Sequence, residues 1–276
     1  MKYYYREHLR GYQRIQAEGK TAWNEIHGMS GFENFSSRSF LEAILPRLCF
    51  DTLHPTALEL GCGTGPGACF LAARGIEVDA VDLVPTAIEI AREQARVRSL
   101  EVNYWVQDIC LLPHEGKQYD MIADSYCLQG IVTEEDRDRV FAAVRARLGP
   151  EGYYLVSCAM FAPTRVHREE RLIDDLSGTV YLRYGTEGWI DLQASIAYVC
   201  LDGDSAGYPD AVCVNGVWLL PHRRHRQASA LRAEIEGAGF DVLYQDEDYG
   251  GNLVCVHRGA RSRLWPERDG LSELEV

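Results

Sequence analysis

Residues 57–67 read Ala57-Leu58-Glu59-Leu60-Gly61-Cys62-Gly63-Thr64-Gly65-Pro66-Gly67. A short apolar run leads into alternating glycines, and a helix is predicted directly after them, up to Arg74. Glycine lacks a β-carbon, so it tolerates positive φ and lets a ligand approach the backbone closely. A strand, a tight loop and a helix start predict a nucleotide-like ligand at the carboxyl end of a first parallel strand. The alternative is that these glycines only shape a tight loop.

From Thr56 onward, strand-like and helix-like segments alternate along the chain. Strands are predicted at 56–60, 76–81, 101–106, 119–124 and 152–160, and helices at 65–74, 85–98 and 133–148. Such alternation implies right-handed crossovers and a parallel sheet covered on both faces. A helix at 227–238, followed closely by strands at 241–245 and 252–257, predicts a terminal hairpin. The predicted fold is therefore α/β, with a Rossmann-like seven-stranded, mostly parallel sheet whose last strand is antiparallel.

Two segments fall outside this scheme. Residues 2–28 are amphipathic at helical spacing, and Gly11 and Gly19 predict two short helices there. A further helix is predicted at 39–48, ended early by Pro46. Residues 161–221 contain β-like runs and a strong hairpin turn at Asn215-Gly216, which predicts a small antiparallel insertion.

The predicted organisation has four parts. An N-terminal helical lid covers residues 1–50, although its aromatic residues also suit plain core packing. The core comprises 51–160 and 222–258, and a β-rich substrate cap is inserted at 161–221. A charged, irregular C-terminal tail at 259–276 is expected to be partly disordered.

Composition narrows the function classes. The net charge of −13 over 276 residues disfavours a nucleic-acid partner, because phosphate contacts need a basic surface. The chain shows no apolar run long enough to span a bilayer and no secretory signal, so a cytoplasmic protein is expected. Its nine cysteines are scattered without the spacing of a zinc site. Neither a metal site nor a disulfide framework is predicted.

Several motifs together resemble class I S-adenosylmethionine-dependent methyltransferases. Glu59–Gly65 resembles the family's first motif, and Asp82 closes the second strand as its ribose-binding acid does. Gln107-Asp108-Ile109 resembles its adenine-binding turn, and residues 119–125 its fourth-strand motif. The turn Leu148-Gly149-Pro150-Glu151-Gly152 is similar to that before its fifth strand, departing at Glu151. The resemblance covers about 56–159, with a weaker echo at 237–257.

The resemblance implies that S-adenosylmethionine is the cofactor. Asp82 would accept hydrogen bonds from the ribose hydroxyls, and Asp108 would accept one from the adenine amino group, with Leu83 and Ile109 on either side of the ring. The alternative is that both acids are only structural, with Asp82 capping a helix and Asp108 standing in a turn. Arg38 is predicted for the methionine carboxylate from its position alone. The predicted cofactor residues are Glu59, Gly61, Cys62, Gly63, Gly65, Asp82, Leu83, Asp108, Ile109, Asp124, Ser125 and Arg38.

Two other functions fit parts of the pattern. Residues 63–68 also match the G-x-G-x-x-A fingerprint of a nicotinamide-binding oxidoreductase, with Asp82 at the expected distance. Three features oppose an oxidoreductase: Glu59, Asp108 and the terminal helix–strand–strand pattern. A non-catalytic S-adenosylmethionine-binding module on the same fold is the third possibility, because fold does not fix activity.

Methyl transfer requires an acceptor held in line with the sulfonium, and a base where the acceptor must lose a proton. His222 and Tyr126 are the predicted catalytic residues. The basic run 222–226 suits an anionic group on a small-molecule acceptor, or else it is only a solvated lead-in to a helix. Arg223, Arg224, Tyr181 and Tyr198 are the predicted substrate-binding residues.

Overall fold

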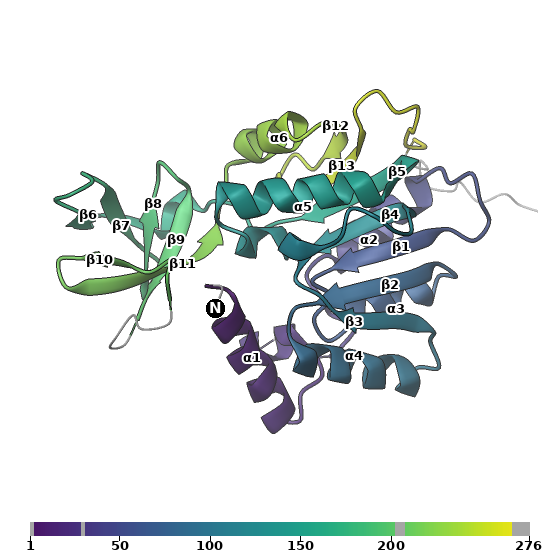
Figure 1. Cartoon of the computed structure of the whole chain (residues 1–276), viewed down its shortest axis with the longest axis horizontal. Helices are drawn as coiled ribbons and strands as arrows, with labels where there is room; N and C mark the ends of the chain where they lie inside the picture. Colours follow the sequence, from purple (N-terminus) through teal and green to yellow (C-terminus); the bar gives the residue numbers. More distant parts are fainter. Residues whose placement is uncertain (1–2, 29–30, 202–207, 267–276) are drawn as a thin grey trace, which may run out of the picture.

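The computed structural model describes residues 3–28, 31–201 and 208–266, which form two sheets with flanking helices (Figure 1). The larger sheet has seven strands in the order β12-β13-β5-β4-β1-β2-β3. Its strands are β1 (Thr56–Leu60), β2 (Glu77–Asp82), β3 (Val102–Val106), β4 (Tyr119–Ser125), β5 (Leu148–Ser157), β12 (Phe240–Gln245) and β13 (Asn252–His257).

Strands β1 to β5 are mutually parallel, whereas β13 runs antiparallel to both β5 and β12. The fold prediction is confirmed, including the antiparallel last strand. Helices α3 (Pro66–Ala72) and α4 (Pro85–Val97) cover one face, and α5 (Glu134–Arg147) and α6 (Ala228–Gly237) cover the other (Figure 1). Because both faces are covered, the central strands are largely apolar: Ala57, Leu58 and Leu60 of β1 are all fully buried.

The N-terminal segment comprises α1 (Tyr5–Ala17), the 3₁₀ turn η1 (Trp23–His27), α2 (Arg38–Ile44) and the 3₁₀ turn η2 (Leu45–Arg47). The prediction that Gly11 interrupts the first helix is wrong, because α1 continues through it. A β-carbon at Gly11 would lie 2.4 Å from the Trp23 ring, so this glycine allows close packing. The break comes at Gly19, whose φ is +65°. Pro46 does end the next helix early, at Ile44.

The smaller sheet is antiparallel, in the order β10-β11-β9-β8-β7-β6. Its strands are β6 (Val166–Ile173), β7 (Val180–Tyr184), β8 (Gly188–Asp191), β9 (Ile196–Cys200), β10 (Val212–Val214) and β11 (Val217–Arg224). The predicted hairpin joins β10 to β11, with φ of +50° at Asn215 and +80° at Gly216. The sequence did not indicate β6, a largely exposed and charged strand, or the short β8.

Strand β11 and the predicted C-terminal tail each differ from expectation in one respect. Strand β11 continues to Arg224, so the basic run 222–226 begins inside a strand rather than in a lead-in to a helix. In the predicted tail, Leu264 pairs with Leu48 in an isolated antiparallel bridge, while residues 267–276 lie outside the described residues. Within 3–28, 31–201 and 208–266, no helix combines the length and apolarity that crossing a bilayer requires.

Candidate active site

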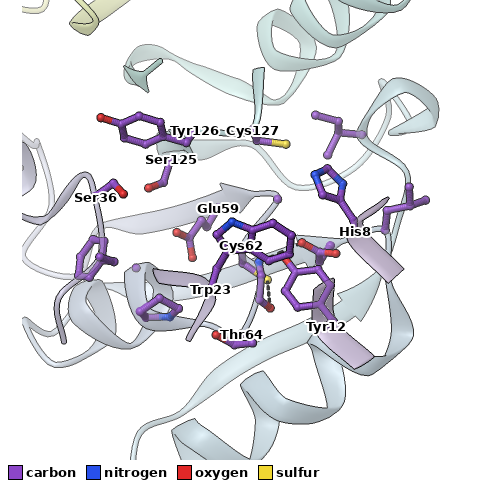
Figure 2. A pocket seen from close by; sticks show the side chains of 18 of the residues that line it. His8, Tyr12, Trp23, Ser36, Glu59, Cys62, Thr64, Ser125, Tyr126 and Cys127 are labelled. Atoms are coloured by element: carbon purple, nitrogen blue, oxygen red, sulfur yellow. Dashed lines mark hydrogen bonds between the residues drawn. The ribbon is translucent and has the colours of Figure 1, made fainter. Parts of the chain in front are cut away.

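The carboxyl ends of β1, β2, β3 and β4 meet beneath α1 and η1 at a cavity of about 300 Å³ (Figure 2). Its size is within the range of small-molecule sites. The predicted site residues that line it are Glu59, Gly61, Cys62, Gly63, Asp82, Leu83, Asp108, Ile109, Ser125, Tyr126 and Arg223. The lining residues that the sequence reasoning did not assign are Tyr4, His8, Tyr12, Ala22, Trp23, Asn24, Phe35, Ser36, Thr64, Pro66, Gly67, Gln107, Cys127, Gln129 and Ile131.

The glycine loop forms the floor of the cavity. Gly61 and Gly63 have φ of +64° and +56°, which other residues adopt only with strain. A β-carbon at Gly61 would lie 2.4 Å from the Cys127 sulfur, and one at Gly63 would lie 3.0 Å from the Tyr12 hydroxyl. The loop therefore has neighbours on two sides that leave no room for side chains.

Asp82 stands at the end of β2 and faces this loop. Its Oδ1 accepts from the Val84 amide at 2.9 Å, and its Oδ2 accepts from the Gly63 amide at 3.0 Å. Burial raises the pKa of Asp82 to about 6, because desolvation outweighs these hydrogen bonds.

Asp108 follows β3 and holds the next position along the edge of the sheet. Its Oδ1 accepts from the Cys110 amide at 2.9 Å, and the Tyr4 hydroxyl donates to Oδ1 and Oδ2 at 3.1 and 3.0 Å. Leu83 and Ile109 line the cavity beside the two acids. This juxtaposition is what the sequence predicted for the ends of neighbouring parallel strands.

Two more buried carboxyl groups lie behind the loop. Glu59 receives a hydrogen bond from the Ala68 amide, while its Oε2 has no partner among the described residues. Asp124 accepts from the Cys127 and Leu128 amides through Oδ1, and its Oδ2 is likewise without a partner. Burial raises the pKa of Glu59 to about 8 and that of Asp124 to about 7. Unsatisfied buried oxygens suit a ligand that brings positive charge and hydrogen-bond donors.

Helix α1 closes the cavity from the opposite side. Tyr4, which directly precedes α1, and His8 and Tyr12 within it recur at every fourth position and so lie on one side of the helix. Figure 2 shows Tyr12 pointing from α1 toward Cys62, with Trp23 beside it and the His8 ring on the side of Cys127. Burial, together with the nearby Arg223 cation, lowers the pKa of His8 to about 4. The stripe of three hydrogen-bonding side chains on an otherwise amphipathic helix was the signal that could have identified this face.

The loop after β4 forms another wall. The Ser125 hydroxyl lies 2.5 Å from that of Ser37, which joins β4 to the start of α2. Tyr126 has a φ of +63°, and its hydroxyl lies 3.5 Å from that of Tyr249. A bulky residue held at positive φ is strained, and such residues gather at functional sites.

Several predicted site residues lie away from the cavity. Arg38 is paired with Glu42 and Glu33 on the outer surface of α2, so the position-based prediction for it finds no support. Gly65 and Asp124 lie behind the lining residues. Tyr181 and Tyr198 pack against each other in the core of the smaller sheet, with ring centroids 5.2 Å apart.

The basic run separates into residues with different surroundings. Arg223 lines the cavity and lies 3.3 Å from Glu7. His222 does not line it, because its Nδ1 is held by Glu7 at 2.8 Å. Arg224 is buried against the Val132 carbonyl and Glu134, so it is a structural residue. No cluster of three or more candidate metal ligands occurs in the described part of the chain.

A family model described as "Methyltransferase domain" matches residues 57–152. A ubiquinone biosynthesis O-methyltransferase of Coxiella burnetii (strain Dugway 5J108-111) is 30% identical over 95 residues, 34% of this chain and 39% of that protein. The enzyme of the same name from Xylella fastidiosa (strain M23) is 34% identical over 101 residues, 36% of this chain and 40% of that one. The chain thus spans about two fifths of the length of the curated relatives it matches.

Solved structures share the fold over more of the chain. The CcbJ methyltransferase from Streptomyces caelestis superposes with a TM-score of 0.58 at 19% identity, covering 83% of this chain and 93% of that one. An S-adenosylmethionine-dependent methyltransferase from Clostridium acetobutylicum ATCC 824 has a TM-score of 0.56 at 16% identity, covering 86% and 96%. At these identities the likeness concerns the fold.

Proposed function

Because residues 57–152 form a methyltransferase domain of the class I family, with S-adenosylmethionine as methyl donor, we propose that this protein methylates a small-molecule acceptor. The observation that carries the proposal is the convergence of three acids on one cavity. Glu59, Asp82 and Asp108 come from the ends of adjacent strands β1, β2 and β3, and all three line it. A nucleoside that bears a cationic amino-acid chain matches such a set of acceptors.

The residues present fit this cofactor. Asp82 would hold the ribose and Asp108 the adenine amino group, with Leu83 and Ile109 against the ring. The partnerless Glu59 Oε2 supplies an acceptor for the ammonium end. When bound, S-adenosylmethionine supplies an electrophilic methyl group on a positively charged sulfur. The chain has to orient the acceptor in line with that methyl group and keep water away from it.

A small acceptor is favoured by the covered cavity and by the acidic charge of −13. Aromatic side chains of Trp23, Phe35 and Tyr126 line it, which suits a flat, partly apolar molecule. The relatives named above are O-methyltransferases of ubiquinone biosynthesis, so hydroxylated aromatic compounds are the first acceptors to test.

His8 is the better candidate for a base than His222. It is the histidine that lines the cavity among the described residues, and its lowered pKa keeps the ring neutral at pH 7. A neutral imidazole can take the proton of a hydroxyl acceptor as the new bond to carbon forms, or the proton of an ammonium acceptor before it attacks. Arg223 lies beside it, although its pairing with Glu7 offsets its charge.

Titration calorimetry with S-adenosylmethionine and with NADPH tests the cofactor assignment. Binding of S-adenosylmethionine is expected, and binding of NADPH alone would overturn the proposal. Asp108→Asn should weaken S-adenosylmethionine binding about tenfold, since a hydrogen bond to a charged group is lost. Asp120→Asn is the matched control, because Asp120 accepts from Thr56 at the opposite end of the sheet.

A metabolite panel with detection of S-adenosylhomocysteine then tests catalysis. Acceptor-dependent formation of this co-product is expected. Tight cofactor binding without turnover of any hydroxylated aromatic, amine or carboxylate in the panel would instead favour a non-catalytic binding module.

A further inference from the structure

The charged side chains that line the cavity are divided between its two ends. The three acids that suit the cofactor, Glu59, Asp82 and Asp108, come from the ends of β1, β2 and β3. Arg223 comes from β11 of the smaller sheet, and it is the one arginine or lysine among the described residues that line the cavity. One end of the cavity therefore accepts positive charge, whereas the end at β11 offers a cation.

Arg223 is held so that one edge of its guanidinium lacks an acceptor. Its Nη1 and Nη2 donate to Glu7 at 3.3 Å each, and Nη1 also donates to the His222 carbonyl at 2.8 Å. These contacts leave Nε–H and the adjacent Nη2–H without an acceptor among the described residues. Two parallel N–H groups on a planar guanidinium match the two oxygens of a carboxylate. Glu7 thus positions Arg223 and leaves this edge for a ligand.

Gln129 presents a second unused donor. It belongs to the 3₁₀ turn η4 (Leu128–Gly130) and lines the cavity. The Ala159 amide donates to its Oε1 at 2.8 Å, and because a backbone amide can only donate, this contact determines which end of the carboxamide is oxygen. Nε2 therefore points away from Ala159, and it has no acceptor within the described part of the chain.

The turn η4 lies next to both α1 and β11. A β-carbon at Gly130 would lie 3.9 Å from the His8 ring, and β11 packs beside η4. Glu7, the partner of Arg223, directly precedes His8 in α1, whose N-terminal end lies toward the smaller sheet (Figure 1). The unused donors of Arg223 and Gln129 are therefore at the end of the cavity that holds His8.

We propose that the acceptor is a hydroxylated aromatic carboxylate, and that Arg223 and Gln129 bind its carboxylate group. This inference rests on the proposed function and narrows its substrate class. The carboxylate would accept from the unused edge of Arg223 and from Gln129 Nε2, which brings the rest of the acceptor close to His8. Three donors on a single cation suit a carboxylate, because the larger charge of a phosphate would meet no second cation.

The first test compares matched ligands on the complex with S-adenosylhomocysteine. Calorimetry measures the binding of 4-hydroxybenzoate, of 3,4-dihydroxybenzoate and of the two corresponding carboxamides, which keep the shape and lose the charge. Each carboxylate is expected to bind about ten- to a hundredfold more tightly than its carboxamide, the range for hydrogen bonds to a charged group. Equal or tighter binding of the carboxamides, or no binding of either hydroxybenzoate, would overturn the proposal.

Gln129→Glu tests the second donor with little change of shape. A carboxylate at position 129 still accepts from the Ala159 amide, but it presents an oxygen to the cavity instead of N–H donors. Affinity for the hydroxybenzoates should fall at least about tenfold. Affinity for the carboxamides should change less, because their NH₂ group can donate to the new oxygen. Gln118→Glu is the control, since it makes the same charge change at an exposed position before β4. A preference for carboxylates that survives Gln129→Glu would contradict the proposal.

Arg223→Gln removes the cation and should abolish the preference for carboxylates, whereas Arg168→Gln, on the exposed strand β6, should retain it. If Arg223→Gln does not fold, Gln129→Glu decides the outcome. A wild type that binds S-adenosylhomocysteine but shows no preference for carboxylates would refute this inference alone. A wild type that binds neither S-adenosylmethionine nor S-adenosylhomocysteine would instead refute the proposed function.

Discussion

The backbone of Gly61 lies directly against the side chain of Cys127, so that a β-carbon at position 61 would be 2.4 Å from the sulfur and 2.7 Å from the Cys127 β-carbon. The contact joins the end of β1 to the loop that follows β4. Both residues line the cavity, and Cys127 donates its amide to Asp124 at 2.9 Å. A shift of Cys127 would therefore disturb the loop that carries Ser125 and Tyr126.

Gly61→Ala should lower both stability and cofactor affinity. The φ of +64° costs alanine about 1–2 kcal/mol, and the clash with Cys127 adds to that cost. Gly75→Ala is the matched control, since Gly75 has a φ of +81° and open space around its β-carbon position. Urea unfolding and calorimetry should show a loss of stability in both variants, but a loss of S-adenosylmethionine binding only in Gly61→Ala. Equal effects would show that the Cys127 contact is unimportant.

Protein stability should fall as the pH rises from about 6.5 to 8.5. The pKa of Glu59 is about 8 in the folded protein against an ordinary 4.5, and that of Asp124 is about 7 against 3.8. The folded state therefore retains protons that the unfolded state has released, and this stabilisation is lost as the pH passes the folded values. His8 and His225, with pKa values of about 4, contribute their change at lower pH. In urea unfolding, the free energy of unfolding of Glu59→Gln should depend less steeply on pH than that of the wild type. An identical slope in the two proteins would contradict the raised pKa of Glu59.

Cofactor binding should have the opposite pH dependence. A cation binds better to an ionised carboxylate, so S-adenosylmethionine affinity should rise between about pH 5.5 and 8.5, as Asp82, Asp124 and Glu59 ionise. Binding at pH 7 should then release protons, which calorimetry in buffers of different ionisation enthalpy detects. Glu59→Gln should release fewer protons than the wild type. Proton uptake on binding would be the contrary result.

The sheet and the floor of the cavity could be predicted because local sequence determines them. The apolar runs predicted the parallel strands. Because the carboxyl ends of parallel strands meet at one edge of the sheet, Asp82 and Asp108 were expected to lie close together. The resemblance to a known family supplied their expected partners. Both steps depend on residues close in sequence to a strand end.

The roof of the cavity could not be predicted in the same way. Tyr4 meets Asp108 and Tyr12 meets Gly63 from far along the chain, and their spacing also suits ordinary core packing. Gly11 was misinterpreted as a helix interruption because the ring of Trp23 that it accommodates comes from another element. Arg38 was predicted from its position alone, whereas its side chain pairs with Glu42 on the surface of α2. Long-range contacts of this kind have no local signal.

The loop after β4 depends on one buried cation, which yields a last prediction. Arg137 of α5 is 1% exposed and donates to the carbonyls of Leu128 and Ile131 at 2.8 Å each. It also forms a two-pronged ion pair with Glu234 of α6. In Arg137→Ala the carbonyls of Leu128 and Ile131 lose their donor, and Glu234 keeps only its ion pair with Arg226. The free energy of unfolding should therefore fall by about 1–3 kcal/mol.

The control for this prediction lies on the same helix. Arg139 pairs with Glu135 at the surface with a side chain 46% exposed, so Arg139→Ala should cost less than about 1 kcal/mol. Because Gln129 and Ile131 line the cavity, Arg137→Ala should also weaken S-adenosylmethionine binding under conditions where the variant remains folded. Urea unfolding and calorimetry on both variants measure the two effects. Equal stability losses for Arg137→Ala and Arg139→Ala would show that the buried ion pair does not hold this loop, since only the buried residue joins α5, α6 and the cavity wall.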